Sequence, residues 1–153
     1  MQRVLIFLLA LCAAATSQAD GEPNGPALVW SKTASFAETR DTLNQAIAAR
    51  GLVVSYVSHA ATMLDRTAEA VGATRRIYDE AEIVLFCKSD LSYRLVESNP
   101  HNIVLCPYSV AIYTLTTEPG RVYLSIPRPY AGDPVVEPIA ALLAEIIEEV
   151  VAW

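Results

Sequence analysis

Short apolar runs of β-strand length alternate along the chain with amphipathic stretches of helical length. The apolar runs are rich in Val, Ile, Leu, Tyr and Phe, a composition typical of strands. They predict strands over residues 27–33, 52–58, 82–87, 103–115 and 121–126. Pro107 predicts a bend in the fourth strand, because proline lacks the backbone donor that a sheet ladder requires. Thr117–Gly120 (TEPG) predicts the hairpin turn that follows it.

The amphipathic stretches predict helices. Ser35-Phe36-Ala37-Glu38 is a capping-box sequence, and Gly51 is typical of a helix end, so a helix is expected between them. Apolar positions at helical spacing predict a second helix over residues 60–71, ending at Gly72, and a short one over 90–97. Asp133-Pro134 predicts the start of a last helix that runs to the C-terminus with a broad apolar stripe.

This order of elements predicts an α+β fold, with an antiparallel sheet of about five strands and two main helices on one face. The two main helices are the first and the last, and the other helical stretches are short insertions. Residues 27–153 form one domain in this interpretation. Residues 20–26 (DGEPNGP) are polar and rich in Gly and Pro, so we expect them to be a flexible leader.

Three segments of the chain carry a resemblance to a known family. They are FAETRDTLNQAIAARGLVVSYVSHA, AEIVLFCKSDLSYRLVESNP and CPYSVAIYTL…GRVYLSIPRP, which together span about residues 36–129. The chain resembles the family called domain of unknown function 302. The resemblance implies a sheet-and-two-helix fold similar to half of a TATA-binding-protein-like domain, often paired as a dimer, and implies no activity. A typical member has Gly-Asn-Pro where this chain has Cys87-Lys88-Ser89, so the chain resembles a cysteine-bearing branch.

Residues 1–19 have the pattern of a secretory signal peptide. Arg3 gives a positive start, Val4–Ala15 is apolar, and Ser17 and Ala19 are small residues where signal peptidase cleaves. We therefore expect cleavage before Asp20 and export to the periplasm or the extracellular medium. The apolar run is shorter than the roughly 20 residues of a membrane span, so no membrane insertion is expected after cleavage.

Charge and motifs narrow the classes of function. The chain has 17 acidic and 11 basic residues and a net charge of −6, which argues against nucleic acid as a partner. It has no CxxC pair, HExxH, GxSxG or glycine-rich phosphate loop. We therefore expect a protein that is not an enzyme.

Cys87 and Cys106 are the two cysteines beyond the signal peptide. Export favours a disulfide between them, while buried inert thiols and a metal or redox role are the alternatives. A simple hairpin centred near Arg94 would place Cys87 opposite Asn102, so the expected register does not favour the bond. An apolar setting raises the pKa of a thiol, so a structural role is expected for Cys106.

His59 and Met63 are the candidate ligand or metal residues. Four positions apart on a helix, they would lie on one face, and an imidazole with a thioether suits haem iron or copper. The alternative is structural, with His59 at a strand end and Met63 packed in the core. His101 is expected on a surface loop.

Tyr113 and Tyr123 alternate with the apolar core positions of their strands, so they are expected on the second face of the sheet, joined by Trp30 or Tyr56. Such a face suits a dimer contact or a ligand, or stabilises cross-strand pairs alone. The sequence thus favours an exported, non-enzymatic small-ligand-binding module that forms a homodimer. A haem- or copper-binding electron-transfer or sensor protein using Met63 and His59 is the alternative.

Overall fold

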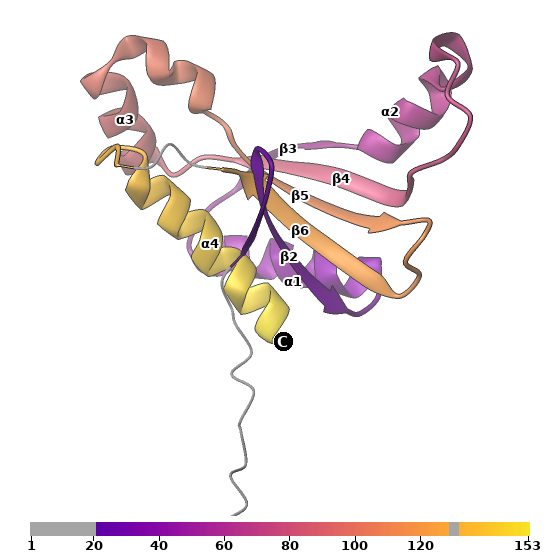
Figure 1. Ribbon diagram of the computed structural model, residues 1–153. Coiled ribbons are helices and arrows are strands. Elements are labelled where there is room, and N and C mark those ends of the chain that lie inside the picture. The colour runs from indigo at the N-terminus through magenta and orange to yellow at the C-terminus, as the bar shows by residue number, and fades with distance from the viewer. Residues whose placement is uncertain (1–20, 129–131) are drawn as a thin grey trace, which may run out of the picture.

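Six antiparallel strands form one sheet in the computed structural model, which describes residues 21–128 and 132–153 (Figure 1). The predicted signal peptide lies outside these residues. The strand order is β1-β2-β6-β5-β4-β3. The strands are β1 (Glu22–Asn24), β2 (Ala27–Thr33), β3 (Val54–Ser58), β4 (Tyr78–Phe86), β5 (Tyr108–Leu115) and β6 (Arg121–Pro127). The mixed fold with an antiparallel sheet confirms the predicted class.

Two long helices cover one face of the sheet. They are α1 (Phe36–Ala49) and α4 (Glu137–Ala152), which lie side by side below the strands in Figure 1. Their apolar stripes meet the inward side chains of the sheet in one core, in which Leu43, Ile146 and Leu124 are fully buried. Burial of this apolar surface is the main force that holds the helices on the sheet. Among the described residues, no helix is long and apolar enough to span a membrane.

The ends of the two long helices are fastened by polar contacts. At the start of α1, the Ser35 hydroxyl accepts a hydrogen bond from the Glu38 amide at 3.2 Å and donates one to the Glu38 carboxylate at 2.8 Å. At its end, Arg50 pairs with Glu149 of α4 at 2.7 Å. Lys32 of β2 donates to the Val150 carbonyl in the last turn of α4 at 3.0 Å. These contacts fix both helices relative to the sheet.

Two helical excursions project from the sheet and give the molecule a V-shaped outline (Figure 1). We call the first the α2 arm: α2 (Ala60–Thr67) and the 3₁₀ helix η1 (Glu69–Val71), which ends at Gly72 in the left-handed conformation. The second, the α3 arm, contains α3 (Ser89–Ser98) and the 3₁₀ helix η2 (Pro100–Leu105). It connects β4 to β5, two neighbouring strands of the sheet.

The structure differs from the sequence prediction at several boundaries. Glu22–Asn24, expected within the flexible leader, pair with Ala27–Val29 as edge strand β1, so the sheet has one strand more than predicted. Residues 103–105, expected in a strand, belong to η2, and β5 begins at Tyr108 after a cis Cys106–Pro107 peptide bond. Strand β4 begins at Tyr78, four residues before its predicted start. Helix α4 begins at Glu137, because Asp133 caps a preceding turn through the Val135 and Val136 amides.

The register between β4 and β5 differs from that of a simple hairpin. Phe86 is opposite Tyr108, so Cys87 comes next to Cys106 and not opposite Asn102. The α3 arm explains the difference. Its two helices, α3 and η2, differ in length and fill the connection between β4 and β5, so the strands are not paired about a centre near Arg94 as a simple hairpin would be. The predicted obstacle to a contact between the cysteines is therefore absent.

Candidate functional site

The face of the sheet opposite α1 and α4 carries a row of tyrosines. Tyr113 of β5 stacks on Tyr123 of β6, with ring centroids 5.3 Å apart, and Tyr78 of β4 meets Tyr113 edge-on at 5.5 Å. The strand neighbours of Tyr113 and Tyr123 are core residues such as Ile112 and Val122, so the three rings lie on the other side. We call Tyr78, Tyr113 and Tyr123 the tyrosine row.

Two further aromatic residues were expected on this face. Tyr56 of edge strand β3 pairs with Leu85, which alternates with the buried Val84 and Phe86, so Tyr56 lies on the predicted side and is 63% exposed. Trp30 faces the other way and is buried in the core, so its placement on the second face was wrong. The reason is its register: Trp30 is opposite Leu124, a core residue.

Two tyrosines of the row, Tyr113 and Tyr123, have pKa values above the ordinary value of a phenol. Burial raises the pKa of the Tyr113 phenol above its ordinary value, with a contribution from Tyr78. The Tyr123 hydroxyl donates a hydrogen bond to Glu118 in the β5–β6 turn, which raises the pKa of Tyr123 because ionisation would break that bond. Both phenols are therefore neutral at physiological pH and present uncharged rings.

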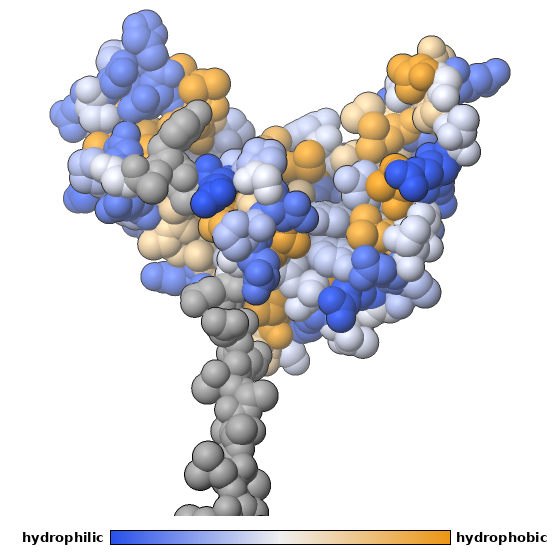
Figure 2. Space-filling view, in the orientation of Figure 1, coloured by the Kyte–Doolittle hydropathy of each residue, from blue (hydrophilic) through white to orange (hydrophobic). Residues whose placement is uncertain are grey.

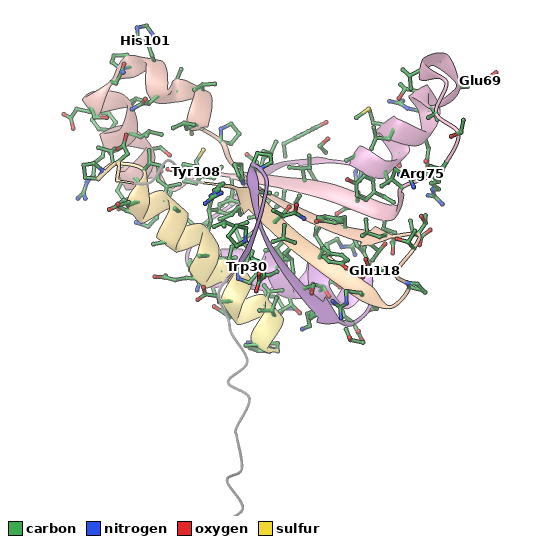
Figure 3. All side chains as sticks on the ribbon, viewed as in Figure 1. Trp30, Glu69, Arg75, His101, Tyr108 and Glu118 are labelled. Carbon is green, nitrogen blue, oxygen red and sulfur yellow. The ribbon has the colours of Figure 1, made fainter. Side chains whose placement is uncertain are left out.

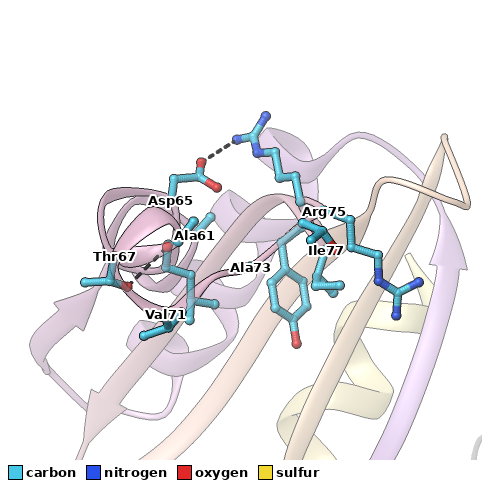
Figure 4. Close-up of a pocket in the computed structure, with 12 residues that line it drawn as sticks. Ala61, Asp65, Thr67, Val71, Ala73, Arg75 and Ile77 are labelled. Atoms are coloured by element: carbon cyan, nitrogen blue, oxygen red, sulfur yellow. Dashed lines mark hydrogen bonds and ion pairs between the residues drawn. The ribbon is translucent and has the colours of Figure 1, made fainter.

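A pocket of about 330 Å³ lies next to the tyrosine row, between the α2 arm and the segment 73–78 (Figure 4). Val71 contributes to one wall and Ile77 to the facing segment. Four of the other lining residues are small or apolar, and five are polar or charged: Ala61, Leu64, Ala68 and Ala73, and Asp65, Thr67, Thr74, Arg75 and Arg76. Tyr78 belongs both to this lining and to the tyrosine row. The pocket and the row thus form one continuous surface.

Arg76 ties the two walls of the pocket together. Its guanidinium pairs with Asp65 of α2 at 3.1 Å and donates to the Asp79 carbonyl at 3.0 Å. The Thr116 hydroxyl donates to the Arg76 carbonyl at 3.1 Å, which anchors the same segment to the end of β5. Asp65 balances the charge of Arg76, but the lining also contains Arg75, so the polar rim of the pocket carries a net positive charge.

Both arms carry exposed apolar side chains, and Figure 2 shows the corresponding apolar surface on each. On the α2 arm and the segment that follows it, these are Met63, Leu64, Val71 and Ile77. On the α3 arm they include Ile103 and Val104, the latter 82% exposed. Exposed apolar residues gathered in this way are typical of surfaces that contact another molecule.

His59 and Met63 lie one helical turn apart, because the Met63 amide donates to the His59 carbonyl at 3.1 Å. His59 precedes α2 and places its Nδ1 atom 3.3 Å from Glu82 of β4. Both side chains are largely exposed, so Met63 does not pack in the core. Within residues 21–128 and 132–153, no group of three or more His, Cys, Asp or Glu side chains is arranged to hold a metal. His101 lies in η2, at the tip of the α3 arm in Figure 3.

Cys87 and Cys106 meet at the base of the α3 arm. Their sulfurs are 2.7 Å apart and both thiols are free. Cys106 Sγ donates to Ser92 Oγ of α3 at 3.6 Å, and Ser92 shares a 2.8 Å hydrogen bond with the hydroxyl of Tyr108, which Figure 3 places near the base of the arm. Burial raises the pKa of the Cys87 thiol, and its contact with Cys106 adds to the effect.

The sequence prediction named Tyr113, Tyr123 and the two cysteines, but missed Tyr78 and the pocket. The lining is formed by α2, Ala68, Val71 and residues 73–78, and residues 68–77 have no strand or catalytic motif. The one available signal was the apolar pair Val71 and Ile77 on either side of a polar, arginine-containing segment. That pattern does not reveal that the segment folds back along α2.

Comparison with known proteins identifies the family. The family model described as "Domain of unknown function DUF302" matches residues 29–152. The chain belongs to this family. A solved member, an uncharacterized conserved DUF302 protein from Bacillus stearothermophilus, superposes with a TM-score of 0.62 at 16% sequence identity, covering 84% of this chain and 98% of that one. At this identity the likeness shows a shared DUF302 fold. No protein with a curated description matches the chain.

Proposed function

We propose that this DUF302 protein is an exported, non-enzymatic module that binds a small, uncharged aromatic ligand and works as a homodimer. The observation that carries the proposal is the pocket between the α2 arm and residues 73–78. Its volume of about 330 Å³ lies at the lower end of the range for ligand sites, so it suits a molecule of one or two rings.

The lining of the pocket supports an uncharged ligand. Half of its twelve residues are aliphatic, and the guanidinium of Arg76 already pairs with Asp65. An anionic ligand would have to compete with that carboxylate for Arg76, and would find Arg75 as the further cation of the lining. An aromatic ring would in addition contact Tyr78, which continues into the tyrosine row, and aromatic pairs contribute about 0.5–1.5 kcal/mol beyond burial of area.

Titration calorimetry with indole as a neutral probe and benzoate as an anionic probe tests this proposal. We expect indole to bind and benzoate to bind more weakly. Ala68→Trp should abolish indole binding by filling the pocket, because Ala68 is part of the lining. The matched control is Ala70→Trp, since Ala70 is exposed on η1 and outside the lining. Equal indole binding by both variants contradicts a ligand site at this place.

The homodimer is supported by the tyrosine row and by the exposed apolar residues of the arms. A second copy of the chain would cover Tyr113 and Tyr123 together with such residues as Leu64 and Val104. A twofold axis uses one surface patch on both copies, so a single charge introduced there is repeated at the interface. Analytical ultracentrifugation should show a dimer that Tyr113→Lys converts to monomer. A monomeric wild-type protein contradicts this part of the proposal.

Haem or copper binding at His59 and Met63 is the second candidate function. It is favoured by the spacing of one helical turn and by the exposure of both side chains, which leaves them open to a ligand from solvent. Purified protein should then take up copper or haem with a change in its optical spectrum. The change should be lost in Met63→Leu, and a wild-type protein that takes up neither rejects the candidate.

A further inference from the structure

The cysteine pair has an arrangement that the ligand pocket does not explain. Cys87 directly follows the last residue of β4, and Cys106 lies between η2 and β5, 19 positions further along the chain. Their two sulfurs are in contact at the point where the α3 arm leaves the sheet and returns to it. A covalent bond between them would close the base of the arm into a ring.

The two sulfurs differ in their surroundings. Cys87 lines an open surface hollow of about 530 Å³, together with Arg50, Ser55 and Lys88. Cys106 is held by its hydrogen bond to Ser92, which is itself bonded to Tyr108. A molecule that enters the hollow therefore meets Cys87, while Cys106 is positioned beside it by residues of α3 and β5.

We propose that Cys87 and Cys106 are a reversible thiol–disulfide pair that exchanges with external disulfides, with Cys87 as the sulfur that reacts first. The Cys87 thiol loses its proton to solvent, and its thiolate attacks one sulfur of the external disulfide. A mixed disulfide forms and one external thiolate leaves, taking up a proton. The Cys106 thiol then loses its proton to solvent, and its thiolate attacks Cys87 Sγ, forming the internal disulfide and releasing the second external thiolate, which takes up a proton. The pair loses two electrons and two protons, which the external disulfide gains.

The electrostatic setting makes this pair a slow switch and distinguishes it from a catalytic thiol. Burial raises the pKa of Cys87, so the reactive thiolate is scarce at neutral pH and grows more abundant as pH rises. The neighbouring cation, Lys88, is engaged by Asp90 at 2.6 Å. The positive charge of Lys88 is therefore partly balanced by Asp90 and stabilises the Cys87 thiolate less than an unpaired lysine would.

The consequence of oxidation falls on the α3 arm. Its exposed residues, such as Tyr93, Ile103 and Val104, belong to a segment joined to the sheet at both ends beside the sulfurs. The disulfide would fix these two ends to each other and restrict opening of the arm, because the cross-link lowers the conformational entropy of the opened segment. The redox state of the pair would then set how rigidly the arm presents its apolar surface.

Oxidised glutathione is the probe that tests the proposal on the full chain. After timed exposure, free thiols are alkylated and the cysteine peptides identified by mass spectrometry, which separates Cys87 and Cys106 from Cys12. We expect an internal Cys87–Cys106 disulfide in the wild type, formed faster at higher pH and reversed by a dithiol. Cys106→Ser should accumulate glutathione on Cys87, whereas glutathione should attach more slowly to Cys106 in Cys87→Ser, because Cys87 lines the hollow and Cys106 does not. Hydrogen exchange of residues 88–105 should slow on oxidation.

Three results would overturn the proposal. If the folded wild type keeps both thiols free in oxidised glutathione, the pair does not exchange with external disulfides. Equal rates of modification in the two serine variants, or a first adduct on Cys106 in acid-quenched wild type, reject Cys87 as the entry sulfur. The acid-quenched wild type decides this point even if a serine variant fails to fold. Hydrogen exchange of the arm that is identical in both redox states rejects the effect on the arm.

Discussion

The rings of Tyr113 and Tyr123 lie nearly parallel on neighbouring strands, with an interplanar angle of 11°. They are direct cross-strand partners in the β5–β6 hairpin, and Tyr78 closes the row from β4. Three adjacent strands therefore present aromatic rings on the face that α1 and α4 leave uncovered. The same tyrosines therefore stabilise the sheet through cross-strand contacts and form part of the surface that we propose for binding.

Alkaline pH should destabilise the fold through Tyr113. Burial raises its pKa in the folded state, so its contribution to stability is complete below the pKa of the unfolded chain, about 10, and is lost as pH rises through the folded value. Urea denaturation across this range should show falling stability, with a shallower fall in Tyr113→Phe. Tyr56→Phe, at an exposed position, is the control and should keep the wild-type slope. An unchanged slope in Tyr113→Phe contradicts the prediction.

Ile146→Ala should reduce the free energy of unfolding by about 2–5 kcal/mol, through lost burial and the cavity that remains. Ile146 is fully buried in α4 within the core shared with α1 and the sheet. Ile103→Ala makes the same chemical change at a position 60% exposed and should stay within about 0.5 kcal/mol of wild type. Chemical denaturation measures both variants. Similar costs at the two positions would mean that α4 does not pack as described.

Ser35→Ala should cost about 1 kcal/mol, because the Glu38 amide at the start of α1 loses its side-chain acceptor. Thermal unfolding followed by circular dichroism measures the change. Ser31→Ala, at an exposed position on β2, is the control for removing a serine hydroxyl and should be close to neutral. A neutral Ser35→Ala would show that the cap does not contribute to stability.

Oxidation of the cysteine pair should stabilise the fold by about 3 kcal/mol, since a disulfide that closes a loop of this length restricts the unfolded chain. Guanidinium denaturation of the oxidised and reduced proteins measures the difference. In Cys106→Ala, addition of a reductant should leave the midpoint unchanged. An oxidised wild type no more stable than the reduced one would show that strain in the folded state offsets the gain.

Local signals explain which parts of the fold could be predicted from the sequence. Strand β2 has the predicted bounds, and α1 follows the predicted Ser35 cap, because a regular pattern and a capping residue act within a few positions. Edge strand β1 was missed because Glu22-Pro23-Asn24 has no apolar pattern, and only its pairing with β2 makes it a strand. Residues 103–105 are apolar enough for a strand but follow Asn99, whose side chain caps η2.

The candidate sites show the same contrast between features set by local sequence and features set by tertiary contacts. Alternation along β5 and β6 was enough to predict the face of Tyr113 and Tyr123, because strand periodicity determines which face a side chain occupies. Tyr78 was missed because β4 begins four residues before its predicted start. The contact between Cys87 and Cys106 depends on where α3 ends and η2 begins, because these two helices connect β4 to β5. No local pattern in the sequence specifies that boundary. The pocket depends on the Asp65–Arg76 pair between two segments, a tertiary contact that periodicity does not encode.

The position of β2 in the sheet also determines when the fold can form. Strand β2 pairs with β6, so Ala27 lies opposite Pro127 and Thr33 opposite Arg121. A chain emerging from the ribosome carries β2 long before its partner exists, with Leu28 and Trp30 still lacking the β6 residues they face. Closing a loop of this length is entropically costly and slows folding. The sheet can therefore be completed only after β6 has been synthesised, and a truncation ahead of Arg121 removes the strand on which it depends.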